Sequence, residues 1–324
     1  MRTRAYLGID TSNYTTSAAL FEPASGRMTG VRRLLQVREG SVGLKQSDAV
    51  FAHVKNLPEL LVQAMEQAGN PVLAGVGVSV RPRDIEGSYM PCFLAGRLAA
   101  CSAAQGAGVP MFSFSHQAGH IAAALFASGR LEWRKKPFLA FHVSGGTTEC
   151  LLVEPDREGK LPFSIRRVAG SLDLKAGQAI DRVGVMLGLG FPAGPELDLL
   201  AQGCEKEIKV SPAMKGADCC LSGVENQCRR MLDTGAPPEE IAKYCICSIE
   251  AAVAGMTEAA LEEYGPLPLL YSGGVMSNSR IQRNLGQKYG GVFVPAAYSS
   301  DNACGIAVLA ALEAGEVLGG LAQL

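Results

Sequence analysis

Two histidines, His116 and His120, have the residue type and the spacing that suit metal chemistry, and they are two of the four histidines in the chain. Four-residue spacing on a helix places both imidazoles on one face, within reach of one ion. A divalent ion that does chemistry needs at least one more protein ligand, and a carboxylate is the expected type. Asp301 is the candidate, although it also fits the N-cap of a helix that begins near Ala303.

Three glycine-rich turns are the next candidates for chemistry, at residues 144–147, 191–194 and 272–275. None has the spacing of a Walker loop or of a Gly-x-Gly-x-x-Gly motif. Glycines at strand ends let backbone amides approach a phosphate or a ribose, because no Cβ is in the way. Together the turns predict a bound nucleotide, and the paired glycines that would contact it are Gly145, Gly146, Gly273 and Gly274.

The first hairpin, residues 5–21, carries the candidate catalytic residues Asp10 and Ser12. Asp10 ends an apolar strand, and a turn of Thr, Ser and Asn leads into a second strand. This pattern is typical of the start of a phosphate-binding hairpin. A hairpin whose polar residues only satisfy its own backbone fits the segment equally well.

The elements that position these residues form a repeated pattern. Residues 5–21 and 138–154 both read as apolar strand, small-residue turn and apolar strand, and strands alternating with helices are typical of a parallel sheet with covering helices. We therefore expect an α/β protein of two related lobes, residues 1–133 and 134–302, with the C-terminal helix 303–324 joining the first. A nucleotide and metal cleft is expected between the lobes.

Local patterns predict several further elements. Residues 48–65 and 238–263 have helical spacing, and Pro58 suggests the start of a new helix within the first stretch. Residues 32–37 suggest a third strand, and residues 221–225 suggest a strand end followed by a turn. His53, in the first of these helices, is expected to be a solvated or core residue more often than a substrate contact.

Composition narrows the class of protein. The 324 residues are 48% hydrophobic with a net charge of −1, so no overall field attracts nucleic acid or a membrane. The charged segment 129–137 is interpreted as a solvated connector in preference to an RNA contact. No signal peptide or membrane-spanning stretch is evident, so a cytoplasmic location is expected, and the ten cysteines are expected to be free thiols.

At this point the motifs, taken in order, resemble the TsaD family of tRNA threonylcarbamoyladenosine transferases, once called glycoproteases, which have an actin-like ATPase (ASKHA) fold. The motifs that carry the resemblance are His-x-x-x-His at 116–120, Ser-Gly-Gly-Thr-Thr at 144–148, Ala-Ile-Asp-Arg-Val at 179–183, Gly-Leu-Gly-Phe-Pro-Ala-Gly-Pro at 188–195, Leu-Ser-Gly at 221–223, Ser-Gly-Gly-Val-Met-Ser-Asn at 272–278 and Ser-Asp-Asn at 300–302. The resemblance covers nearly the whole chain, and the combination of motifs is specific.

The resemblance implies a reaction and a set of site residues. His116, His120 and Asp301 would hold one divalent transition metal, iron or zinc. The reaction would move a threonylcarbamoyl group from threonylcarbamoyl-adenylate to N6 of an adenosine beside the tRNA anticodon, so tRNA and the proteins of a tRNA-modification complex are the expected partners. ATP or the adenylate would contact Val143, Ser144, Gly145, Gly146, Thr147, Asp181, Gly194, Asp198 and Asn278.

The chain also departs from the family pattern. The first hairpin has one acidic residue, Asp10, where the family usually has three, an Arg-Pro-Arg sequence at 81–83 replaces a Gly-Pro-Gly turn, and Thr147 replaces a histidine. These departures predict a divergent paralogue. Two alternatives stay open, a carbamoyltransferase with another acceptor and a non-catalytic nucleotide-binding partner. Peptidase activity is not expected, because Gln117 stands where a zinc peptidase has its glutamate base.

Overall fold

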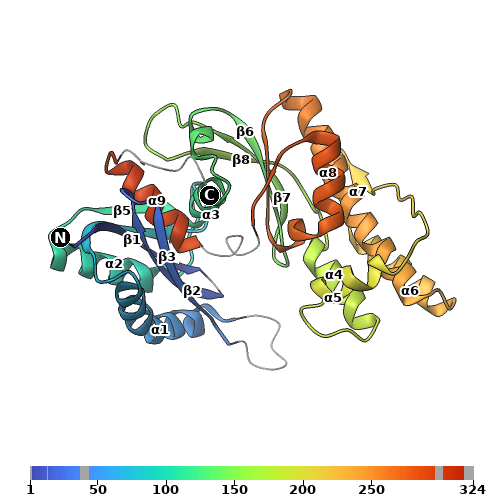
Figure 1. Cartoon of the computed structure of the whole chain (residues 1–324), viewed down its shortest axis with the longest axis horizontal. Helices are drawn as coiled ribbons and strands as arrows, with labels where there is room; N and C mark the ends of the chain where they lie inside the picture. The colour runs from blue at the N-terminus through green and yellow to red at the C-terminus, as the bar shows by residue number, and fades with distance from the viewer. Residues whose placement is uncertain (1, 13, 37–43, 296–301, 317–324) are drawn as a thin grey trace. The chain divides into compact units, whose positions relative to one another are not determined.

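The computed structural model describes residues 2–12, 14–36, 44–295 and 302–316, which fall into two units (Figure 1). Unit 1 comprises Met1–Arg134, Asp156–Ser164 and Ser300–Leu324, and unit 2 comprises Lys135–Pro155 and Ile165–Ser299. The C-terminal helix of the described chain, α9 (Asn302–Glu313), therefore belongs with the N-terminal residues.

Unit 1 is built on a five-stranded sheet in the order β3-β2-β1-β4-β5. β1 (Arg4–Ser12) pairs antiparallel with β2 (Thr15–Glu22), which pairs antiparallel with β3 (Arg27–Leu34), whereas β4 (Val72–Arg81) is parallel to both β1 and β5 (Met111–Ser115). Seven consecutive residues of β1 are buried. A strand with helices on both faces is expected to be apolar without alternation, which is why its sequence reads as a continuous apolar run.

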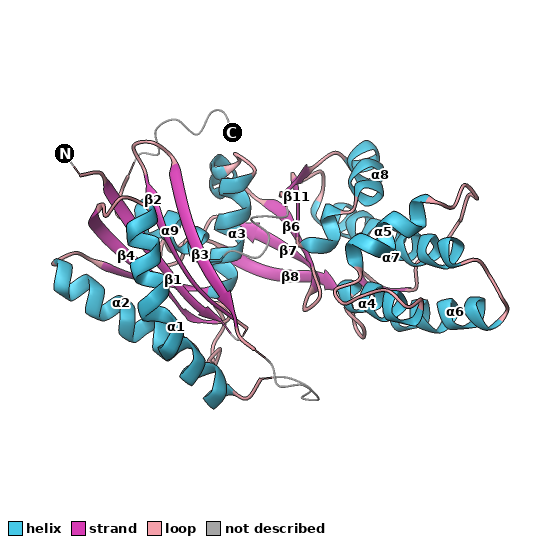
Figure 2. Ribbon diagram, turned by 60° about the horizontal axis from the view of Figure 1, so that its bottom comes forward, coloured by secondary structure: helices cyan, strands magenta, loops and turns pink. Residues whose placement is uncertain are grey.

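The helices of unit 1 cover both faces of this sheet (Figure 2). α1 (Gln46–Gln67) and α2 (Phe93–Ala107) pack on the face that carries Leu7 and Ile9. α9 packs on the other face together with α3 (His116–Ala127). Gly8 and Gly77 face α9, and a Cβ on either one would overlap the backbone of that helix. These two glycines therefore let α9 lie directly on the sheet.

Unit 2 repeats the same strand order, written β8-β7-β6-β11-β12. Its members are β6 (Phe138–Val143), β7 (Thr148–Glu154), β8 (Ser164–Gly170), β11 (Leu269–Ser272) and β12 (Val292–Phe293). The first pair, β6 and β7, is antiparallel, and β11 is parallel to both β6 and β12, as β4 is to its neighbours in unit 1. The predicted duplication of an α/β unit is confirmed by this common topology.

The helices of unit 2 are α4 (Ala176–Met186), α5 (Gly194–Gln202), α6 (Ser222–Asp233), α7 (Pro238–Tyr264) and α8 (Ser279–Tyr289). Short 3-10 turns η1 (Leu131–Lys135) and η2 (Gly274–Ser277) and a small ribbon of β9 (Met214–Lys215) and β10 (Asp218–Cys219) complete the described elements. By length and composition α7 is the one helix in the described residues that could cross a membrane. Over half of its most apolar window, 56%, is buried inside the protein, as in the core helix of a globular unit.

Two predictions about local structure are wrong. Pro58 does not begin a new helix, because α1 continues through it. Pro58 is exposed, so water can satisfy the carbonyl that loses its helical partner. Residues 221–225 are not a strand end but the start of α6, where the Asp173 carboxylate accepts hydrogen bonds from the Leu221 and Ser222 amides at 2.7 and 3.2 Å. That cap comes from 48 residues earlier in the chain, so the local sequence does not reveal it.

Candidate functional site

The two histidines lie at the start of α3 and converge as their spacing predicts. His116 is the first residue of the helix, and its Nε2 lies 3.0 Å from Nε2 of His120 one turn later. Its other ring nitrogen, Nδ1, lies 3.0 Å from Oδ1 of Asp10 at the end of β1. Asp10 therefore occupies the Nδ1 side of His116 and leaves Nε2 directed toward His120.

This arrangement fits a metal ion. Two imidazole nitrogens that share one ion at about 2.0–2.1 Å each must lie within about 4 Å of one another, and the separation of 3.0 Å meets that limit. Metal-binding histidines usually give their second ring nitrogen to a carboxylate, as His116 does to Asp10. No three His, Cys, Asp or Glu side chains group as a metal site among the described residues, and Asp301, the expected third ligand, lies outside them.

Asn302, which follows Asp301 in the chain, reaches the histidine pair. Its Nδ2 lies 2.6 Å from His116 Nδ1 and 3.1 Å from Asp10 Oδ1. Gly119 on α3 makes room for this amide, because a Cβ there would lie 2.7 Å from Asn302 Oδ1. The chain next to Asp301 is thus held at the site by a buried polar side chain.

Asp10 is buried but held in its ionised form. Burial opposes the charge, but the imidazole of His116 and hydrogen bonds from His116, Ser79 and Asn302 hold the pKa of the Asp10 carboxyl below its usual range. Ser12 meets the same carboxylate through its backbone amide, 3.3 Å from Oδ2. The structure therefore brings Asp10 to the histidine pair, and Ser12 contacts Asp10 through its backbone.

A clamp that we did not predict from the sequence fixes the start of α3. Arg81 Nε donates to Asp84 Oδ1 at 2.9 Å, and the Ser115 hydroxyl donates to Asp84 Oδ2 at 2.5 Å. Ser115 in turn caps α3 by accepting from the Ala118 amide. Arg81 belongs to the Arg-Pro-Arg sequence that departs from the family turn, so the departure has a structural role. An Asp three residues after an Arg was the signal available in the sequence.

His53 proves to be a core residue. It is fully buried in α1, and its Nδ1 lies 2.8 Å from the Thr16 hydroxyl of β2. Burial lowers the pKa of His53 to about 4, so the ring is neutral at physiological pH. It therefore stabilises the first hairpin through its contact with β2 in the core of unit 1.

The second predicted group lies in unit 2 around a cavity of about 480 Å³. Six predicted nucleotide contacts line this cavity, which we call the nucleotide pocket after that prediction, namely Gly145, Asp181, Gly194, Asp198, Gly274 and Asn278. Asp181 Oδ1 accepts from the Ala193 amide at 2.9 Å and so fixes the approach to α5. Asn278 caps α8 through the amides of Arg280 and Ile281. The walls of the pocket thus come from the starts of two helices and from glycine-rich turns, which suit phosphate and ribose groups.

Five other predicted contacts do not line this pocket, namely Val143, Ser144, Gly146, Thr147 and Gly273. Ser144 closes its own turn, because its amide donates to the Thr147 carbonyl at 2.7 Å and its hydroxyl accepts from the Thr147 amide at 3.2 Å. Gly273 has φ +101°, and a Cβ there would overlap the Val143 backbone. These residues shape the β6–β7 turn and the end of β11, which carry Gly145 and Gly274 into the wall.

The remaining wall residues were not named as contacts by the sequence reasoning, although Pro192 and Val275 lie in two of the predicted turns. They are Gly177, Ile180, Pro192, Pro195, Ile246, Val275 and Ser277. Most of them adjoin a predicted residue within the same motif, which was the available signal. Ile246 is different, since it lies within the apolar pattern of α7, which gives no sign that one of its residues borders a ligand site.

Comparison with known proteins supports this interpretation. Residues 38–308 match the family model TsaD, described as tRNA N6-adenosine threonylcarbamoyltransferase. A protein of that name from Thermus thermophilus is 31% identical over 96% of this chain and 92% of its own length. Another from Corynebacterium diphtheriae is 30% identical over 85% of this chain and 81% of its own length.

Solved structures with low sequence identity share the fold. HypF of T. kodakarensis has a TM-score of 0.62 at 13% identity and covers 97% of this chain and 48% of its own. The activator of 2-hydroxyisocaproyl-CoA dehydratase from Clostridium difficile, solved with ADPNP, has a TM-score of 0.54 at 14% identity, with 96% of both chains covered. These likenesses confirm the α/β actin-like ATPase fold, and the sequence matches show that the chain belongs to the TsaD family of tRNA N6-adenosine threonylcarbamoyltransferases.

Proposed function

We propose that this protein transfers a threonylcarbamoyl group from threonylcarbamoyl-adenylate to N6 of an adenosine beside the anticodon of a tRNA, in the cytoplasm. The observation that carries the proposal is the family match over residues 38–308. The nucleotide pocket supports it, because five residues that the family resemblance assigns to the nucleotide, from four separate segments, line one cavity. The partner proteins of a tRNA-modification complex belong to the same proposal.

The pocket residues would bind and orient the adenylate. Gly145, Gly194 and Gly274 present backbone without side-chain bulk, so phosphate and ribose oxygens can approach main-chain amides. The carboxylates of Asp181 and Asp198 are acceptors for ribose hydroxyls or the adenine amine. Because these groups lie on helices and tight turns, the adenylate would be held in one orientation, which is the main requirement for a transfer between two bound substrates.

The transfer itself exchanges one bond for another. A bond forms between N6 of the adenosine and the carbamoyl carbon, and the bond from that carbon to the phosphate oxygen breaks. AMP leaves with the electron pair, and N6 loses one proton to water. The low pKa of Asp10 makes it a poor proton acceptor, so we assign Asp10 the role of positioning His116.

His116 and His120 would hold a divalent iron or zinc ion together with Asp301. When bound, the ion supplies Lewis-acid stabilisation of phosphate and carbamoyl oxygens. Asp10 keeps the His116 ring in place, Asn302 Nδ2 donates to the Asp10 carboxylate, and the clamp of Arg81 and Asp84 fixes the start of α3. The retained histidine pair and pocket give no support to a non-catalytic role. Gln117, which follows His116, gives no support to peptidase activity.

A transfer assay tests the proposal. The purified protein is mixed with threonylcarbamoyl-adenylate and unmodified tRNA, with and without the partner proteins of its own organism, and the nucleosides are analysed by mass spectrometry. We expect modified adenosine in the wild-type reaction. Absence of product under all these conditions, with intact nucleotide binding, would favour another acceptor.

A matched pair of variants links the assay to the pocket. Asp198→Ala removes a carboxylate from the pocket wall, and Asp233→Ala removes an exposed one from α6. A hydrogen bond to a charged group contributes about 1.5–3 kcal/mol, so Asp198→Ala should weaken ADP binding about tenfold or more in calorimetry. Asp233→Ala should bind as the wild type does. Equal ADP affinity in the wild type and both variants would show that Asp198 does not contribute to ADP binding.

A further inference from the structure

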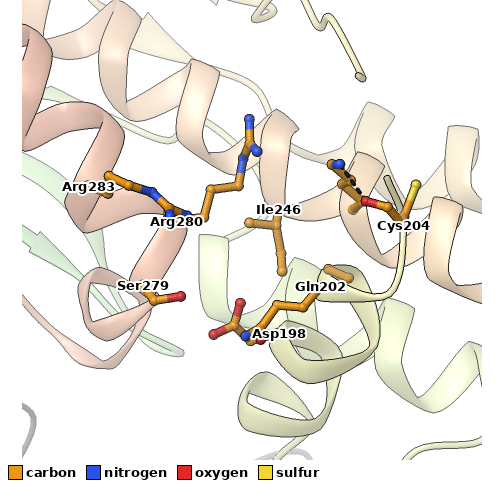
Figure 3. A pocket seen from close by; sticks show the side chains of 9 residues that line it. Asp198, Gln202, Cys204, Ile246, Ser279, Arg280 and Arg283 are labelled. Carbon is orange, nitrogen blue, oxygen red and sulfur yellow. Dashed lines mark hydrogen bonds between the residues drawn. The ribbon is translucent and has the colours of Figure 1, made fainter. Parts of the chain in front are cut away.

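A second cavity of unit 2, which we call the arginine pocket, adjoins the nucleotide pocket (Figure 3). Its volume is about 340 Å³, and it shares Asp198 and Ile246 with the nucleotide pocket. Its lining residues are Asp198, Ala201, Gln202, Cys204, Lys243, Ile246, Ser279, Arg280 and Arg283. In Figure 3 the arginines extend from α8 on one side, and Asp198 and Gln202 from α5 on the other. Apart from the shared Asp198, the family resemblance assigns no role to the residues of this second cavity.

Positive charge dominates the lining. Lys243, Arg280 and Arg283 face one carboxylate, that of Asp198. α8 itself carries Arg280, Arg283 and Lys288 and no acidic residue. Since the whole chain has a net charge of −1, this concentration of cations is a local feature.

The three cations differ in how they are held. Arg280 Nε lies 2.8 Å from Glu250 Oε2, which anchors its guanidinium. Lys243 Nζ donates to the Cys204 carbonyl at 2.6 Å and keeps further donors for another acceptor. The side chain of Arg283 makes no hydrogen bond or ion pair with the part of the chain that the structure describes. Two positive side chains, Lys243 and Arg283, thus have no carboxylate partner within that part.

Lysine and arginine side chains are hydrogen-bond donors only, so a ligand that suits this cavity must offer several acceptor oxygens. A phosphate group offers them and pairs with the planar guanidinium through two parallel hydrogen bonds. We propose that the arginine pocket binds a phosphate group beside the bound adenylate. The proposal rests on the proposed function, which supplies a backbone phosphate of the tRNA as one source, and a small free phosphate from solution is the other.

The test uses Arg283→Gln, which removes one charge from an exposed side chain, and Arg283→Glu, which reverses it. Arg229→Gln on α6 is the matched control, because Arg229 is also exposed and lies outside both pockets. Each full-length protein is titrated with an anticodon stem-loop RNA at several salt concentrations and with inorganic phosphate. ADP binding is measured in parallel, so that damage to the nucleotide pocket is detected separately.

The outcomes separate the two sources. If an RNA phosphate occupies the pocket, Arg283→Gln makes the negative slope of log affinity against log salt shallower by about 0.7–0.9. Arg283→Glu then lowers the RNA affinity further. With a small anion, saturable binding of inorganic phosphate weakens about tenfold in both variants, and the RNA titration is unchanged. The proposal is overturned if both titrations equal those of Arg229→Gln. If the wild-type protein itself did not bind ADP, the proposed function would be contradicted instead.

Discussion

Replacing Asp10 by Asn should weaken metal binding without emptying the nucleotide pocket. Asp10 is 1% exposed, and its Oδ1 lies 3.0 Å from His116 Nδ1 and 3.1 Å from Asn302 Nδ2, with the Ser79 hydroxyl donating to the same oxygen. The Asn side chain has nearly the same shape but no charge. The change therefore removes the electrostatic hold on the His116 ring and leaves the packing in place.

The size of the effect follows from these contacts. A hydrogen bond to a charged group contributes about 1.5–3 kcal/mol, and each 1.4 kcal/mol corresponds to a factor of about ten in affinity. Loss of a carboxylate behind a metal-binding histidine typically costs about 10–100-fold in metal affinity, which lies within that range. We expect Asp10→Asn to raise the Kd for Zn²⁺ or Fe²⁺ by about 10–100-fold, and His116→Ala to raise it further.

Competition with a chelator of known affinity measures the change on metal-free, reloaded protein. Ser12→Ala is the control, because Ser12 contacts Asp10 through its backbone amide, which the substitution keeps. ADP binding should stay at the wild-type value in Asp10→Asn, since the nucleotide pocket is lined by unit 2 alone. A Kd for the metal within twofold of wild type in Asp10→Asn would refute the positioning role, and an unchanged Kd in His116→Ala would refute the site.

Three further changes test the fold around the site. Asp84→Asn should weaken the hydrogen bond from the Ser115 hydroxyl. We expect metal affinity to fall about tenfold and ADP binding to stay unchanged. Metal affinity equal to that of the wild type would contradict the role of the clamp. Gly8→Ala places a Cβ against the α9 backbone and should lower the free energy of unfolding in urea by about 1–3 kcal/mol, whereas Gly106→Ala, in open space on α2, should raise it by about 0.5–1 kcal/mol. Because burial lowers the pKa of His53 from 6.5 to about 4, its contribution to stability is complete above pH 6.5 and is lost as the pH falls toward 4. Urea unfolding of His53→Gln should therefore show a smaller loss of stability across that range than the wild type, and parallel curves would reject this linkage.

The sequence by itself determined the features that depend on short stretches of chain. The convergence of His116 and His120 follows from four-residue spacing on any helix, and the structure has it. The repeat of strand, turn and strand predicted the duplicated sheets, because apolar periodicity and turn residues are local signals. The motif order predicted the family, and the structure gathers six of the predicted nucleotide contacts around one cavity.

Only the tertiary structure decided which distant segments complete the sites. Asp10 and His116 are 106 residues apart, and they meet because β1 and β5 both pair in parallel with β4 and bring their carboxyl ends to one edge. The Asp173 cap of α6 and the place of Ile246 in both pockets depend in the same way on packing. Contacts across parallel strands and between packed helices have no fixed spacing along the chain, so no periodic pattern in the sequence reports them.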